Sequence, residues 1–183
     1  VRVGADADAS LVEVHLTADV DALVAPVTDL SIGPAARFHH AVLQDVGPKV
    51  WHLGTLDATV DRDATLDVGV AALGGDYARL RLDCRLDGKG ATGNLSSVYL
   101  GDGDQMLDLR TFQSHNAPNT TSNLLFKGGV ADTAHSVYTG LIRIAPGAKG
   151  SNAFQTNRNI KLSDGAWAES VPNLEIENND VHC

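Results

Sequence analysis

Short stretches of alternating apolar and polar residues run through the whole chain and predict β-strands. Near the N-terminus, Val12, Val14 and Leu16 point one way while Glu13 and His15 point the other, which predicts a half-buried strand. The cleanest alternation covers residues 80–87 and places Leu80, Leu82, Cys84 and Leu86 on one side. No segment of twelve residues shows helical periodicity, so we expect an all-β protein.

The predicted strands recur at a near-constant interval in the last third of the chain. Ile142 and Ile160 are 18 residues apart, as are Ile144 and Leu162. Small, turn-prone runs at 146–150 and 163–166 separate the strands. This pattern is typical of a stacked β-solenoid. A β-sandwich is the alternative, but Asp-Gly hairpin signals occur only at 87–88, 102–103 and 164–165.

Composition and charge narrow the class of protein. The chain has 183 residues, 43% of them apolar, and no linker or shift in composition, which predicts a single domain over 1–183. A net charge of −9 argues against nucleic acid and anionic membranes as partners, and no apolar run is long enough to span a bilayer. Two cysteines suggest a reducing cytoplasm. Val1 and a strand-like ending at Cys183 suggest a fragment of a longer protein.

Most candidate chemical motifs have a structural explanation. Residues 88–93 match G-x-G-x-x-G, but a strand-like segment follows where a nucleotide site needs a helix, so we expect a corner. The seven histidines lack metal-site spacing, and we expect surface or corner positions for them. Asp102 and Asp104 fit a solvated turn. Cys84 shares the apolar side of its strand and is predicted to be a buried, inert thiol.

His182 and Cys183 are the exception, because two metal-ligand residue types stand side by side after the polar run 175–180. They are candidates for a metal or cluster role. The sequence offers no catalytic residues with a recognisable motif. Its carboxylates cannot be placed across a cleft, so a β-helix enzyme acting on polysaccharide stays open as an alternative, although only 5% of residues are aromatic and could stack on sugars.

An ordered set of segments resembles a known family. The set runs through 107–111, 115–116, 123–128, 138–142, 155–159, 172–176 and 180–183, with earlier pieces at 51–54 and 62–64. In this order they resemble the core domain of the SufB/SufD family, the scaffold proteins of Suf iron–sulfur cluster assembly. The resemblance implies a right-handed parallel β-helix and a scaffold that is not an enzyme.

The same resemblance implies partners and cofactors. Members of the family pair a SufB subunit with a SufD subunit through their β-helices, and a helical C-terminal segment docks the SufC ATPase. That segment would lie beyond Cys183, so we expect the flanking helical segments to be absent here. An iron–sulfur cluster would be held transiently by the complex, and a reduced flavin is sometimes associated with it. A homodimer of this chain is left open.

Two positions bear on the type of subunit. SufB-type chains carry a cysteine implicated in cluster assembly where this chain has Ser163, so the resemblance is to the SufD type. SufD-type chains end this run with a cysteine like Cys183, followed two residues later by a histidine outside this sequence. Cys183 is therefore the one residue for which the resemblance implies a metal role.

Overall fold

The computed structural model describes residues 1–183, and every regular element in it is a β-strand. The strands are β1 (Arg2–Val3), β2 (Asp8–Leu16), β3 (Ala22–Val24), β4 (Val27–Ile32), β5 (Arg37–Asp45), β6 (Val50–Val60), β7 (Thr65–Ala72), β8 (Tyr77–Leu86), β9 (Thr92–Gly101), β10 (Met106–His115), β11 (Thr121–Val130), β12 (His135–Ile144), β13 (Ser151–Lys161), β14 (Trp167–Ile176) and β15 (Val181–His182). No helix capable of crossing a membrane is present.

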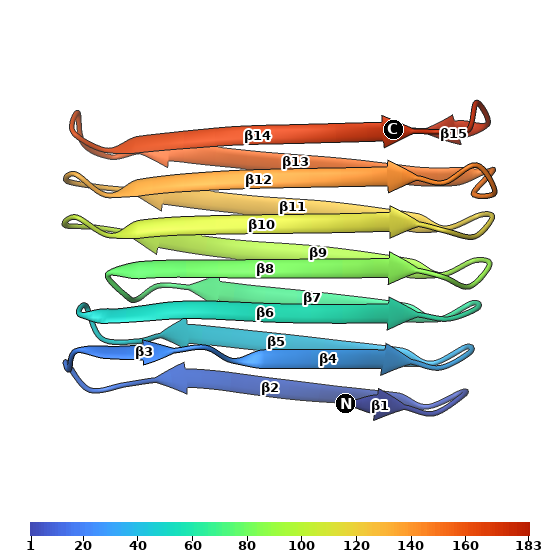
Figure 1. Cartoon of the computed structure of the whole chain (residues 1–183), viewed down its shortest axis with the longest axis horizontal. Coiled ribbons are helices and arrows are strands. Elements are labelled where there is room, and N and C mark those ends of the chain that lie inside the picture. The colour runs from blue at the N-terminus through green and yellow to red at the C-terminus, as the bar shows by residue number, and fades with distance from the viewer.

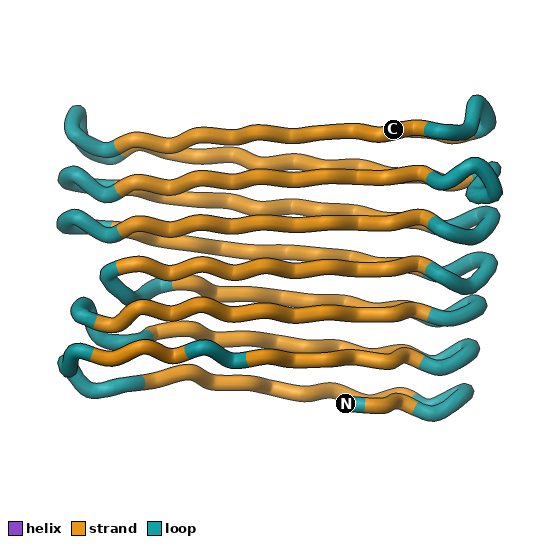
Figure 2. Tube along the Cα trace, in the orientation of Figure 1, coloured by secondary structure: helices purple, strands orange, loops and turns teal.

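The strands form two parallel sheets that face each other. The eight-stranded sheet has the order β1-β4-β6-β8-β10-β12-β14, with β3 also paired to β6, and the seven-stranded sheet has the order β15-β13-β11-β9-β7-β5-β2. In Figure 1 the chain crosses the front sheet from left to right, returns through the rear sheet and climbs one level per circuit. This path is right-handed and confirms the predicted parallel β-helix. Figure 2 shows that turns connect the sheets at both sides.

The repeat of the solenoid is longer than the sequence analysis predicted. Trp51 pairs with Tyr77, 26 residues later, while Met106 pairs with His135, 29 later, and His135 pairs with Trp167, 32 later. The predicted interval of 18 residues is wrong as a coil length. Ile142 lies in β12 and pairs with Leu174, whereas Ile160 lies in the opposite sheet and pairs with Gly129. The 18-residue spacing measures the step from one sheet to the other.

Side chains alternate between the lumen and the two outer faces. The lumen is filled mainly by aliphatic residues and by a few aromatic rings, with Leu66, Leu82, Leu95, Tyr99, Phe126 and Tyr138 among the fully buried ones. Small side chains such as Ala58, Ala64 and Ala91 allow the two sheets to approach. This core holds the polar lumen residues of the first and last coils in fixed positions.

Strand β2 has its apolar side chains outside and its polar side chains inside, the opposite of the usual arrangement for a half-buried strand. Val12, Val14 and Leu16 are 70%, 49% and 63% exposed on the outer face. Glu13 and His15 point into the lumen, where they meet polar side chains from other strands. The register of β2 with β5 places Glu13 and His15 inside, where hydrogen bonds satisfy them, and the apolar residues form part of an outer surface.

One corner is built in the same way in successive coils. Its residues Asp6, Ala35, Asp63, Gly90, Asn119 and Gly150 all have a left-handed backbone with φ between 56° and 76°. Each donates its N–H to the carbonyl that precedes the equivalent corner of the next coil, as Ala35 does to Arg62 at 2.8 Å. The residue after the corner is small and points inward. Residues 88–93 contain one of these corners, as predicted, and β9 follows directly.

Candidate functional site

The C-terminal thiol lies at the open end of the seven-stranded sheet. β15 pairs with β13 through Ser151–Val181 and Asn152–His182, and the exposed Cys183 follows directly. Partial burial raises the pKa of the Cys183 thiol. His182 is exposed beside it. No three His, Cys, Asp or Glu side chains lie close enough together to hold a metal ion. The predicted His182–Cys183 pair is thus accessible, but no further protein ligand completes it.

The other cysteine is sealed in the core. Cys84 is 1% exposed, and Gly93 packs so closely against its sulfur that a methyl group there would be in steric conflict. Burial raises the pKa of the Cys84 thiol to about 12, so it stays neutral. The prediction that Cys84 is buried is confirmed. A neutral thiol is a poor metal ligand, because the thiolate is the form that binds metals. Cys183 is the accessible thiol of the chain.

Ser163, which the resemblance in the sequence matches to a SufB-type cysteine, occupies a turn after β13. Its hydroxyl accepts a hydrogen bond of 2.9 Å from the backbone N–H of Asp132 in the preceding coil. The residue therefore joins two neighbouring turns of the solenoid. A hydroxyl in this position cannot supply the thiolate that favours iron.

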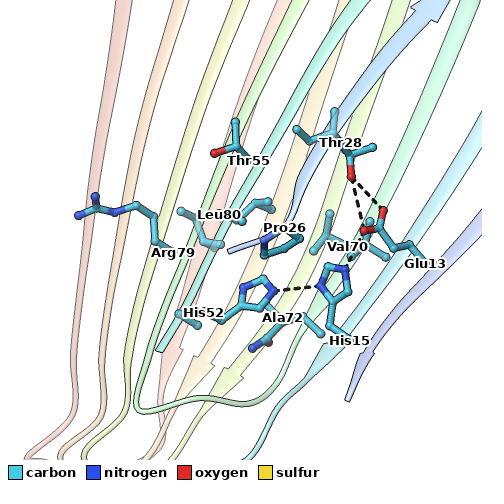
Figure 3. Close-up of a pocket in the computed structure, with 16 residues that line it drawn as sticks. Glu13, His15, Pro26, Thr28, His52, Thr55, Val70, Ala72, Arg79 and Leu80 are labelled. Carbon is cyan, nitrogen blue, oxygen red and sulfur yellow. Dashed lines mark hydrogen bonds and ion pairs between the residues drawn. The ribbon is translucent and has the colours of Figure 1, made fainter. Parts of the chain in front are cut away.

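A second polar site lies in the lumen of the first coils, and we call it the histidine cluster: Glu13, His15, His40 and His52. The His15 ring bridges the group, because its Nδ1 lies 2.9 Å from Nε2 of His52 and its Nε2 lies 2.7 Å from Oε1 of Glu13. Nε2 of His40 lies 3.0 Å from the other carboxylate oxygen, Oε2. Figure 3 shows the His15 ring between His52 and Glu13, with Thr28 above the carboxylate.

Burial and hydrogen bonding oppose each other in this cluster. Burial alone would raise the pKa of Glu13, but hydrogen bonds from His15, Thr28 and His40 outweigh it and lower that pKa. Burial lowers the pKa of His52 to about 4, and the neighbouring His15 adds to the effect. Burial also lowers the pKa of His40, although Glu13 opposes the shift. The cluster thus stabilises one carboxylate and disfavours charge on the two most buried rings.

A small cavity of about 30 Å³ adjoins the cluster. Pro26, which interrupts the front strand between β3 and β4, forms one part of its wall. Gln44, Val70 and Arg79 form other parts of the lining. A space of this size can hold a water molecule.

The last coils contain a third polar group, which we call the amide cluster: Tyr99, Asn157, Asn159 and Ser170. The Tyr99 hydroxyl donates to Asn159 at 2.5 Å and accepts from the Asn157 amide at 2.8 Å. Ser170 hydrogen-bonds to Asn157. Gly128 leaves the space for this arrangement, because a methyl group there would overlap the Tyr99 ring. The cluster joins β9, β13 and β14 across the lumen.

The three histidines of the histidine cluster lie far apart in the sequence, and the fold brings them together. Their surface and corner assignment was wrong for His15, His40 and His52, which lie in or at the edge of the lumen. The surface assignment was also wrong for His115, which is fully buried and hydrogen-bonds to Thr120 and Ser122. One local signal was present, since Glu13 and His15 are two residues apart and share a side of their strand. The contacts with the third and fourth strands depend on the coil length, which the sequence pattern did not reveal.

The whole chain, residues 1–183, matches the protein-family model described as "SUF system FeS cluster assembly, SufBD core domain". An iron–sulfur cluster assembly SufBD family protein of Mycobacterium tuberculosis is 35% identical over 157 residues, which cover 82% of this chain and 40% of that protein. The iron–sulfur cluster assembly protein SufD of Escherichia coli is 30% identical over 154 residues, 84% of this chain and 36% of that protein. A second SufBD family protein of Mycobacterium tuberculosis is 26% identical over 161 residues, 88% of this chain and 19% of that protein. The chain spans about two fifths of the first of these relatives.

Proposed function

Because the chain belongs to the SufBD family of iron–sulfur cluster assembly proteins, we propose that it is the β-helix core of a SufD-type scaffold subunit. In this role it pairs with a SufB-type paralogue and supports cluster assembly at their interface, with the cluster as cargo. The longer relatives that it matches extend well beyond this core, so docking of a SufC-type ATPase belongs to segments outside it.

The distribution of thiols carries this proposal. A cluster of the [2Fe–2S] or [4Fe–4S] type is usually held by four cysteine thiolates. This chain has two cysteines, Cys84 is sealed, and Ser163 stands where the SufB-type chain has its cysteine. Cys183 can therefore contribute one ligand at most, and the others come from a second subunit. Two free thiols also suit a reducing compartment such as the cytoplasm.

The outer face of the seven-stranded sheet supports pairing through the β-helix. Leu125 on β11 is 46% exposed on this face, and Phe154 is 52% exposed on β13, the strand that pairs with β15. A shallow groove of about 540 Å³ continues across the face and is lined by Val12, Ala41, Leu43, Gly69, Ala71, Val98 and Leu125. Contiguous exposed apolar residues are a feature of protein–protein interaction sites. Cys183 would lie at the margin of such an interface.

The role of Cys183 can be tested by cluster assembly in the complete complex of this subunit, its SufB-type paralogue and the ATPase. Cys183→Ser should lower the cluster yield, because it removes the accessible thiol while leaving the fold intact. Cys84→Ala is the matched control and should leave the yield per folded complex unchanged, since that thiol is neutral and enclosed. A Cys183→Ser complex with the wild-type cluster yield would remove Cys183 from the site.

A further inference from the structure

The histidine cluster forms all its hydrogen bonds when its three rings are neutral. His15 donates from Nε2 to Glu13, and His40 donates from Nε2 to the second carboxylate oxygen. Nδ1 of His15 then has no proton and accepts a hydrogen bond from Nε2 of His52. Thr28 adds a donor at 3.2 Å from Oε2 of Glu13. In this state the cluster has a single negative charge, on the carboxylate.

One additional proton can enter without breaking any of these bonds. The proton binds Nδ1 of His52, and the proton between the two rings then moves to Nδ1 of His15. His15 becomes an imidazolium that donates to Glu13 at 2.7 Å and to His52 at 2.9 Å. The positive ring lies directly beside the carboxylate, so the cluster is neutral overall and its bonds persist.

A second additional proton cannot bind any group of the cluster without breaking a hydrogen bond. If His15 and His52 were both doubly protonated, two N–H donors and two positive charges would face each other at 2.9 Å. If His40 were charged, its Nδ1–H would be buried without an acceptor, because that atom has no partner. If Glu13 were protonated, its surrounding donors would compete for one weakened acceptor. Each choice breaks at least one hydrogen bond of the first coil.

The strand that would respond is β2. It carries both Glu13 and His15, ends the seven-stranded sheet and pairs with β5 alone. Its outward side chains are exposed, so lumen contacts and the β5 ladder hold it in place. We propose that the histidine cluster is a proton switch for the first coil: it holds β2 closed with none or one added proton and releases β2 from β5 when a second is bound.

The strands packed around the histidine cluster place no further charged group in contact with it, so the proposed switch depends on the cluster alone. β4 contributes Thr28, β5 contributes Gln44 in addition to His40, and β7 contributes Val70 and Ala72, all uncharged. Arg79 of β8 lines the cavity, but its Nε donates to Asp108 of β10 at 2.8 Å. Figure 3 shows its guanidinium group pointing away from the rings. Neither charge of that pair contacts the cluster.

The sign of the pH effect follows from His52. Its folded-state pKa is about 4, against an ordinary value of 6.5, so the unfolded chain binds more protons between these values. The first coil therefore keeps its full stability above about pH 6.5 and loses it as the pH falls toward about 4. The buried His40 has its pKa shifted in the same direction and adds to the loss.

Hydrogen exchange of the 183-residue chain tests the proposal directly. Between about pH 7 and about pH 4.5, after correction for intrinsic exchange rates, amides of β2 should lose about tenfold or more of their protection. Amides of β12 and β13, two strands that contribute no residue to the cavity beside the cluster, should keep theirs over the same range. Unchanged protection in β2 would overturn the proposal, as would an equal loss along the whole solenoid.

A pair of variants separates this switch from other histidines. In His52→Gln the amide can still donate to His15 but cannot take a proton, so the release of β2 should move to lower pH by about one unit. His39→Gln is the control, because His39 lies on the outer face beside Asp67 and should leave the midpoint unchanged. A His52→Gln midpoint equal to that of the wild type would contradict the proposal.

Should His52→Gln fail to fold, the wild-type ring gives the same answer by NMR. The His52 C2–H resonance should report a neutral ring until the pH at which β2 amides begin to exchange. A His52 ring that becomes charged near its ordinary pKa while β2 stays protected would overturn the proposal.

Discussion

At the scale of the residue, the left-handed corner positions organise the solenoid. Each aligns one N–H along the stack, and the residue that follows is buried and small: Ala36, Ala64 and Ala91 in three successive coils. In the later coils this inward position is taken by Thr120 and Ser151, whose hydroxyls lie 2.8 Å apart. Each stacked corner thus supplies a backbone hydrogen bond to the next coil and a small side chain that points into the interior.

Ala35 is the corner whose side chain suits this conformation least. Its φ is 57°, and a left-handed backbone costs an alanine about 1 kcal/mol or more relative to glycine. Ala35→Gly should therefore raise the free energy of unfolding by about 0.5 kcal/mol, after the greater entropy of an unfolded glycine is subtracted. Urea titrations followed by circular dichroism measure the change.

The neighbouring alanine gives the matched control. Ala36 is fully buried and lies outside the left-handed region, so Ala36→Gly should lower stability by about 1 kcal/mol. If both substitutions destabilise the chain equally, strain at Ala35 is not the explanation.

Residue patterns predicted part of the interior and missed part of it. Cys84 was placed correctly because its strand lies in the middle of the solenoid, where apolar alternation and burial agree. The direction of Glu13 and His15 was not predictable from β2 alone, because their partners His40 and His52 belong to β5 and β6. Such contacts depend on the register between coils, which no local pattern contains.

At the scale of the element, each coil is a pair of strands joined by two corners. Apolar alternation identified many of the strands, but the interval between Ile142 and Ile160 joined strands of opposite sheets. The recurring corner with its small inward neighbour, Ala35-Ala36, Asp63-Ala64 and Gly90-Ala91, was a better signal of the coil length. This signal is weak in the sequence, because alanine and aspartate are not usual markers of a left-handed turn.

Removing one complete coil tests the observed repeat. Thr65, Thr92 and Thr121 are aligned in neighbouring strands, so deleting residues 92–120 joins Ala91 to Thr121 with the register kept. The shortened chain should unfold cooperatively and keep its β-sheet circular dichroism, because solenoid coils contact mainly their neighbours.

Deleting residues 92–109, an 18-residue segment, is the control. It would join strand segments of the two sheets out of register, so we expect loss of cooperative unfolding. Equal behaviour of the two deletions would contradict the coil length described above.

At the scale of the whole molecule, the solenoid presents two different ends and an apolar outer face. The first coils contain the histidine cluster, and the last coils contain the amide cluster and, at the opposite end of β13, Cys183. Between them, the outer face of the seven-stranded sheet exposes Val98, Leu125 and Phe154. With a net charge of −9, the molecule suits a protein partner better than nucleic acid. Pairing of this face with a second β-helix is the central claim.

Light scattering after size-exclusion chromatography tests that claim most directly, using this chain co-expressed with its SufB-type paralogue. The proposal predicts one complex with one copy of each chain at micromolar concentration. Leu125→Asp should weaken the complex about tenfold or more, while Val27→Asp, at a residue that is more exposed (71% against 46%) but on the other sheet, should not. Two chains that elute separately at this concentration would contradict the pairing on which the proposed function depends.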